Sequence, residues 1–150
     1  MNVSMTKLLS LHVETLLPPT SIELNIQQND QVAALMGVGL VYQGTAHRHI
    51  SHALLSEIGR PPGPEMKNCV DRESYSLAAG LALGLVILGS GGGTNVPASI
   101  PDTLHYYMVG GHIRPFSGAQ KDKYKSPSYQ IREGDSINID VTSPGATIAL

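Results

Sequence analysis

The stretch "VAALMGVGLVYQGT" at residues 32–45 returns in altered form as "LAAGLALGLVILGS" at residues 77–90. Placed over each other without gaps, the two runs match at Ala33/Ala78, Ala34/Ala79, Gly39/Gly84, Leu40/Leu85, Val41/Val86 and Gly44/Gly89. The repeat distance, from residue 32 to residue 77, is 45 positions. A period between about 20 and 50 residues is typical of supersecondary units that stack because none can bury its apolar face alone.

The first run predicts an inner helix over residues 31–43. Asn29 or Asp30 can cap its start, and Gly44 can end it because glycine tolerates the left-handed backbone conformation. The run is apolar around its whole circumference, so we expect the helix to be buried on all sides. Its small residues would allow neighbouring backbones to come close.

The residues that follow predict an outer helix over 46–58, with Thr45 as its cap. This helix is amphipathic, and its polar residues are His47, Arg48, His49, Ser51, His52 and Glu57. Gly59 and the sequence "RPPGP" end it. The two helices should form an antiparallel pair, which makes residues 29–60 one repeat unit.

The second unit is expected at about residues 71–110. Asp71 can cap a helix over 72–88, which should superimpose on the first inner helix. The sequence Ser99-Ile100-Pro101-Asp102 resembles a capping box with an early proline and opens a short outer helix that ends at Gly110.

The rest of the chain predicts an insertion and a third inner helix. Residues 111–142 are polar and rich in loop-forming residues, and 136–141 alternate like a short β segment. The final "PGATIAL", residues 144–150, repeats the pattern "LAAGLAL" of residues 77–83 and is interpreted as a truncated third repeat. Residues 1–150 are therefore expected to be a fragment of one all-α domain of helical-hairpin repeats, an α-α superhelix.

Four small residues are the candidate helix-packing positions. Gly39 and Gly84 occupy equivalent places in the two runs, as do Ala34 and Ala79. A membrane span is not expected, because it requires about 20 apolar residues and neither run is that long.

Composition excludes several classes of function. Charged residues make up 15% of the chain and the formal net charge is −2, so there is no basic surface for nucleic acid. The single Cys69 cannot form an internal disulfide, and the N-terminus does not follow the pattern of a secretory signal. We expect an intracellular protein.

The residues that could carry chemistry do not form a known site. His47 and His49 would point about 200° apart on a helix, so a metal ion could not reach both together with His52, and a solvated outer face is favoured. Cys69 lacks the surroundings of a catalytic thiol, and "GSGGGT" at 89–94 follows a helix and lacks the Gly-Lys-Ser/Thr ending of a phosphate loop. We expect no catalytic residue, no cofactor, no metal and no small-molecule ligand.

The stretch "GAQKDKYKSPSY" contains a minimal proline-directed phosphorylation motif at Ser126-Pro127. Phosphate on Ser126 would add negative charge beside Lys121, Lys123 and Lys125. An exposed, solvated loop is the simpler interpretation of its composition.

Taken together, the Gly/Ala-rich inner helices resemble proteasome/cyclosome repeats, which occur in two large non-ATPase subunits of the proteasome base and in the largest subunit of the anaphase-promoting complex. Several strings resemble the cyclosome branch in particular: "GLVYQGTAHRH", "LLSEIGRPPGPEM", "DRESYSLAAGLALG", "YMVGGH" and "KSPSYQIREGD". The chain is much shorter than those subunits.

This resemblance implies a segment of a toroid of paired helices that acts as a non-catalytic scaffold in a cullin-RING-type ubiquitin ligase controlling mitosis. It implies partners among the other subunits and the coactivators of that complex, in the nucleus and cytoplasm. Two alternatives stay open: a truncated paralogue that acts as a free-standing protein-interaction module, and a small membrane-associated protein.

Overall fold

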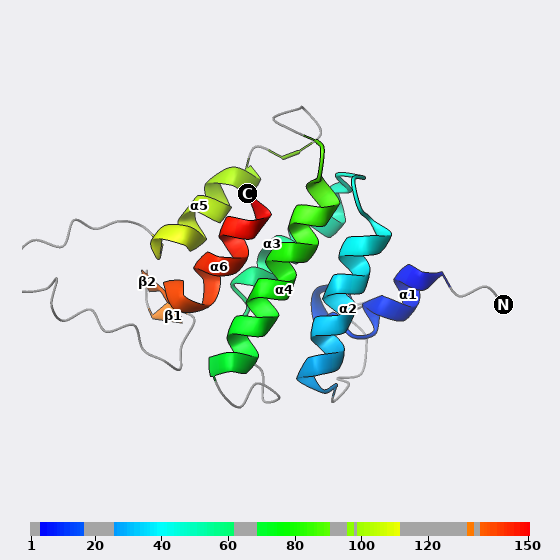
Figure 1. The fold of residues 1–150 in the computed structure, drawn as a ribbon, viewed down its shortest axis with the longest axis horizontal. Helices are drawn as coiled ribbons and strands as arrows, with labels where there is room; N and C mark the ends of the chain where they lie inside the picture. The colour runs from blue at the N-terminus through cyan, green and yellow to red at the C-terminus, as the bar shows by residue number, and fades with distance from the viewer. Residues whose placement is uncertain are drawn as a thin grey trace, which may run out of the picture.

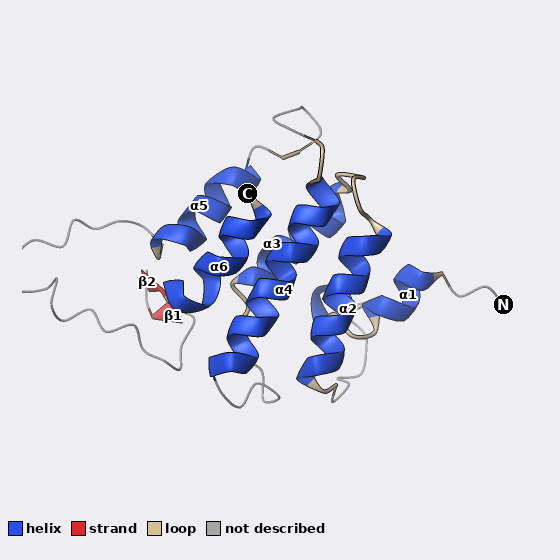
Figure 2. Cartoon of the chain, in the orientation of Figure 1, coloured by secondary structure: helices blue, strands red, loops and turns tan. Residues whose placement is uncertain are grey.

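The computed structural model describes residues 4–16, 26–61, 69–90, 96–97, 99–111, 132–133 and 136–150. This part of the chain is almost entirely helical (Figure 2). Its elements are α1 (Met5–Ser10), the 3-10 helix η1 (Glu14–Leu16), α2 (Gln28–Val41), α3 (Arg48–Ile58), α4 (Cys69–Ile87), α5 (Ser99–Val109), β1 (Arg132–Glu133), β2 (Ser136–Ile137) and α6 (Ile139–Ala149). The all-α prediction is confirmed.

Three helices, α2, α4 and α6, lie side by side and run in the same direction (Figure 1). The central helix of this layer is α4, which packs against α2 on one side and α6 on the other. On another side of α4 lies α3, while α5 packs against α6 and α1 against α2. The inner layer therefore alternates in sequence with the helices that cover it.

Small side chains allow α4 to occupy the centre. Ala78, Ala79 and Ala82 are buried together with Leu83 and Val86, and they form part of one continuous hydrophobic core. An alanine row lets a neighbouring helix approach closely, because only a methyl group separates the two backbones. The second of the two repeated runs thus forms the central helix of the fold, with α2, α3 and α6 around it.

The first inner helix differs from the prediction at its start and on one face. It begins at Gln28, so Asn29 and Asp30 lie in its first turn and neither is the N-cap. It is also not buried on all sides, because Leu40 and Val41 are exposed, and its main neighbours among the described elements are α1 and α4. Gly44, by contrast, has the predicted left-handed conformation, with φ of +68°.

The outer helix α3 starts later than predicted. His47 is its N-cap, and Thr45 instead donates its hydroxyl to the Tyr42 carbonyl, 2.7 Å away. The polar face also needs correction, since Ser51 and Glu57 are buried while His47, Arg48, His49 and His52 are exposed. A helix that is covered by α4, α5 and α6 has a narrower solvated stripe than a single-helix pattern predicts.

The third inner helix starts at Ile139, before the predicted residue 144. The β segment expected at 136–141 is a two-residue strand, β2, which pairs antiparallel with β1. The alternation ends because the Asn138 side chain accepts a hydrogen bond from the Asp140 amide and caps α6. Pro144 therefore lies inside the helix instead of opening it.

Within the part of the chain that the structure describes, none of the helices combines the length and apolar character needed to cross a bilayer.

Candidate functional site: the inner-helix contacts and a buried polar cluster

The helices α2 and α4 come very close together at Gly39. A Cβ atom placed on Gly39 would lie 2.7 Å from the Ala82 Cα and 2.9 Å from the Ala82 Cβ, which is too short for real atoms. Ala34 and Ala79, the other two predicted positions in these helices, are buried in the same core. The chain therefore leaves no room for a side chain at Gly39.

The contact between α4 and α6 follows the same register. Gly84, the repeat equivalent of Gly39, faces Ile148 and Ala149, and Ala149 is the equivalent of Ala82. A Cβ on Gly84 would lie 3.2 Å from the Ile148 carbonyl oxygen and 3.5 Å from the Ala149 Cα, a tight but less severe contact. Two successive pairs of inner helices thus meet with matching residues.

Among the described glycines, an added Cβ atom would make its shortest contact at a pair that the sequence did not single out as packing residues. A Cβ on Gly80 would overlap the Gly145 carbonyl group, and one on Gly145 would overlap the Ser76 carbonyl group. A signal for this pair existed in the third copy of the pattern, where Gly145 aligns with the buried Ala78. At this level α4 and α6 touch backbone to backbone.

We predict that Gly39→Ala lowers the free energy of unfolding, whereas Gly37→Ala, two residues earlier on the same helix, does not. Both changes gain about 1 kcal/mol of helix propensity. At Gly39 the added methyl meets backbone and costs roughly 1–3 kcal/mol, while at Gly37 it meets only the flexible Leu9 side chain, whose Cδ2 would lie 2.9 Å away.

Denaturant unfolding of the two variants and the unchanged chain, followed by circular dichroism, measures the difference. Equal stability of the two variants would show that contact at Gly39 does not constrain the helix spacing.

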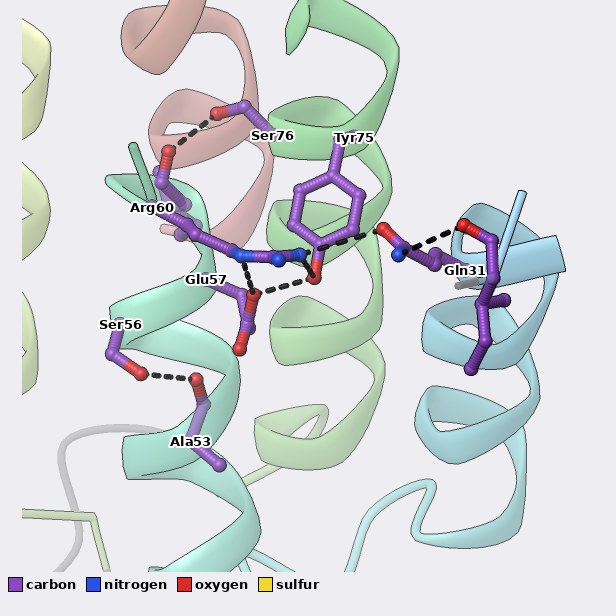
Figure 3. Close-up of polar contacts among 9 residues, drawn as sticks. Gln31, Ala53, Ser56, Glu57, Arg60, Tyr75 and Ser76 are labelled. Carbon is purple, nitrogen blue, oxygen red and sulfur yellow. Dashed lines mark hydrogen bonds and ion pairs between the residues drawn. The ribbon is translucent and has the colours of Figure 1, made fainter. Parts of the chain in front are cut away.

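A cluster of polar side chains joins α2, α3 and α4 beneath this layer (Figure 3). The Tyr75 hydroxyl donates to Glu57 Oε2 at 2.5 Å, and Arg60 Nη1 donates to the Tyr75 oxygen at 3.2 Å and to Gln31 Oε1 at 3.4 Å. Tyr75 is 2% exposed and Glu57 is 1% exposed. Tyr75 therefore connects α4 with the carboxylate of α3, and Arg60 extends the cluster to Gln31 of α2.

The electrostatics of the cluster keep Tyr75 protonated. Burial is the main cause that raises the pKa of Tyr75 far above its ordinary value, and the charge and hydrogen bond of Glu57 raise it further, although Arg60 opposes them. Arg60 Nε lies 4.0 Å from Glu57 Oε2, and its guanidinium carbon lies 5.3 Å from the centre of the Tyr75 ring. The arrangement is a structural ion-pair network with a fixed hydroxyl donor.

Three further hydrogen bonds tie the same helices together. The Ser76 hydroxyl donates to the Ile58 carbonyl at 2.9 Å, and the Gln28 amide donates to Ser74 Oγ at 2.8 Å and to the Asp71 carbonyl at 3.0 Å. The sequence alone does not predict this role of Glu57 and Tyr75, because a carboxylate on an amphipathic helix is usually solvated. The sequence does contain one signal for the ion pair, because Arg60 follows Glu57 by three positions.

The remaining candidate residues do not join these contacts. No group of three or more potential metal ligands occurs among the described residues, and His47, His49 and His52 are exposed on α3. Cys69 is the first residue of α4. Ser126 and its neighbouring lysines lie outside the described residues.

We predict that Tyr75→Phe destabilises the chain by about 1–3 kcal/mol at pH 7, because the buried Glu57 carboxylate loses its hydroxyl donor. Tyr42→Phe is the matched control, since the Tyr42 hydroxyl meets Thr6 at a partly buried position, 3.1 Å away. Its effect should stay within about 0.5 kcal/mol. Similar losses in both variants would contradict the special role of the cluster.

The difference between the unchanged chain and Tyr75→Phe should also depend on pH. Folding holds the Tyr75 proton, so its contribution is complete below about pH 10, where tyrosine in the unfolded chain starts to ionise, and falls as the pH rises further. The stability gap should narrow by about 1 kcal/mol between pH 10 and pH 11. A gap that stays constant across this range would exclude the linkage.

This chain is similar to a small part of several much larger proteins. A family model described as the APC1 fifth domain matches residues 3–150. Anaphase-promoting complex subunit 1 of Mus musculus is 63% identical over 154 residues, which cover 100% of this chain and 8% of that protein. The subunit of the same name from Homo sapiens is 62% identical over 154 residues, with the same coverage, and that from Dictyostelium discoideum is 45% identical over 122 residues, covering 81% of this chain and 5% of that protein.

Proposed function

Because the chain belongs to the family of the APC1 fifth domain, we propose that it is a non-catalytic scaffold segment of the anaphase-promoting complex, a multi-subunit ubiquitin ligase. The observation that carries this proposal is the family match over residues 3–150, supported by identity to the mouse and human subunits along the whole chain. The chain spans 8% of the length of those two relatives, so the proposal concerns a segment and its contribution to the whole.

The geometry supports a mechanical role. Backbone contacts at Gly39 and Gly80 fix the spacing of three parallel helices, and the Tyr75 cluster fixes α3 against them. Closely packed repeats of this kind have little room to deform, so the position of one repeat determines the position of the next. We propose that Gly39, Gly84, Ala34 and Ala79 serve this function by setting the helix spacing.

The partners follow from the same premise. We propose that the segment contributes to contacts with other subunits of the complex and with its coactivators, in a cullin-RING-type assembly that controls mitotic progression. The proposed cellular location is the nucleus and the cytoplasm. The proposal includes no cofactor, nucleic acid or membrane among the partners of this segment.

The proposal is tested by tagging the protein that carries this sequence at its own locus and identifying what co-purifies. The unchanged protein should bring down the other subunits of the anaphase-promoting complex. Gly39→Leu, which forces a branched side chain against Ala82, should reduce recovery of those subunits several-fold, and Gly37→Ala should leave it unchanged. Recovery of the unchanged protein without any such subunit would refute the scaffold role.

We further propose Ser126 as a phosphorylation site of this segment, on the basis of the Ser126-Pro127 motif. Phosphopeptide mapping of the same purified protein from mitotic and interphase cells should find phosphate on Ser126 at higher occupancy in mitosis. Absence of phosphate in both samples, with the peptide itself detected, would remove the site.

A further inference from the structure

The connection between α2 and α3 also holds the end of α4. The Gly44 amide donates to the Leu85 carbonyl and the Ala46 amide donates to the Val86 carbonyl, each at 2.9 Å. The last carbonyl groups of a helix have no partner inside that helix. The segment 42–47 therefore supplies external donors to the C-terminus of the central helix and fastens two repeat units to each other.

His47 holds the other end of this segment. Its Nδ1 atom accepts a hydrogen bond from the Ile50 amide at 3.4 Å, which makes the imidazole the N-cap of α3. The His47 amide in turn donates to Thr45 Oγ1 at 3.3 Å, and the ring packs edge to face on Tyr42 with centroids 5.1 Å apart. The ring is exposed, so a proton from solvent can reach it.

This cap works only with a neutral imidazole. An unprotonated Nδ1 can accept a hydrogen bond, whereas the imidazolium ion carries a proton on both nitrogens and accepts none. The added positive charge would also lie at the N-terminus of α3, where the helix dipole is itself positive. Histidine is the side chain that changes its charge in the range just below neutral pH.

Besides His47, the segment 42–47 contains one ionisable side chain, Tyr42, whose ring lies against the imidazole. Arg48 and His49 follow His47 on α3, and residues 84–90 at the end of α4 contain no ionisable side chain. On the elements that pack on α3 further along, the ionisable residues are Glu14 in η1, Cys69, Asp71, Arg72, Glu73 and Tyr75 in α4, Asp102, His105, Tyr106 and Tyr107 in α5 and Asp140 in α6.

We propose that residues 42–47 form an acid-sensitive latch between the first two repeat units, closed by neutral His47 and released when that imidazole takes up a proton. Release removes the cap of α3 and frees the donors of Gly44 and Ala46 from the end of α4. The latch therefore couples the charge of one exposed side chain to the contact between two inner helices.

Amide exchange measured by NMR on the 150-residue chain, expressed as protection factors at pH 7.5 and pH 5.5, tests the latch. In the unchanged chain the protection of the Ile50 amide should fall on the order of fivefold at the lower pH, the factor that corresponds to an N-cap of about 1 kcal/mol. The Gly44 and Ala46 amides should lose protection with it.

Three variants separate the latch from general acid effects. His47→Asp provides a cap that stays able to accept across this range, so the protection of these amides should not change with pH. His47→Ala should show low protection at both pH values. His52→Ala, which removes another exposed histidine of the same helix, should behave like the unchanged chain.

The proposal is overturned if protection in the unchanged chain is the same at both pH values. It is equally overturned if His47→Asp loses protection as the unchanged chain does, since another group would then cause the change. Loss at Ile50 alone, with Gly44 and Ala46 unaffected, would reduce the effect to fraying of one helix end and would refute the coupling.

Discussion

Backbone contact between the inner helices is the constraint on which the rest of this structure depends. At Gly80 and Gly145 the helices α4 and α6 leave no space for a Cβ atom, and at Gly39 the same is true of α2 against Ala82. Helices that approach this closely gain dispersion contacts along their whole length, but only if every residue at the crossing is small. The Gly/Ala-rich composition of the repeated run is a direct consequence.

The polar cluster complements this packing because glycine and alanine offer few specific contacts. A layer of small residues fixes distance well but fixes rotation and register weakly. Tyr75, Glu57 and Arg60 supply directional bonds between the layers, in surroundings where a misplaced carboxylate would be costly. Tight spacing and a buried network together fix the inner helices and α3 against one another.

The sequence predicted the inner helices and their equivalence because the repeat is visible without any structure. The alignment of Gly39 with Gly84 carries over to their contact partners, Ala82 and Ala149. It could not predict which positions touch most closely, since Gly80 stands opposite Gly145 only after the helices pack.

The burial of Glu57 and the capping role of His47 were missed for a related reason: single-helix patterns do not contain the neighbours that cover a helix or the loop that enters it. The predicted start of the third inner helix at Pro144 was wrong, because the Asn138 cap sets that boundary.

The most direct test of this account is the unfolding free energy of Gly80→Ala in the 150-residue chain. Helix propensity alone favours the alanine by about 1 kcal/mol, and no side chain can move aside to make room, because the added methyl would meet the Gly145 backbone. The overlap costs roughly 1–3 kcal/mol or more, and the account predicts that this cost exceeds the gain in propensity, so that the variant is less stable. Stability equal to or above that of the unchanged chain would contradict it and would show that the inner helices are not held at backbone contact.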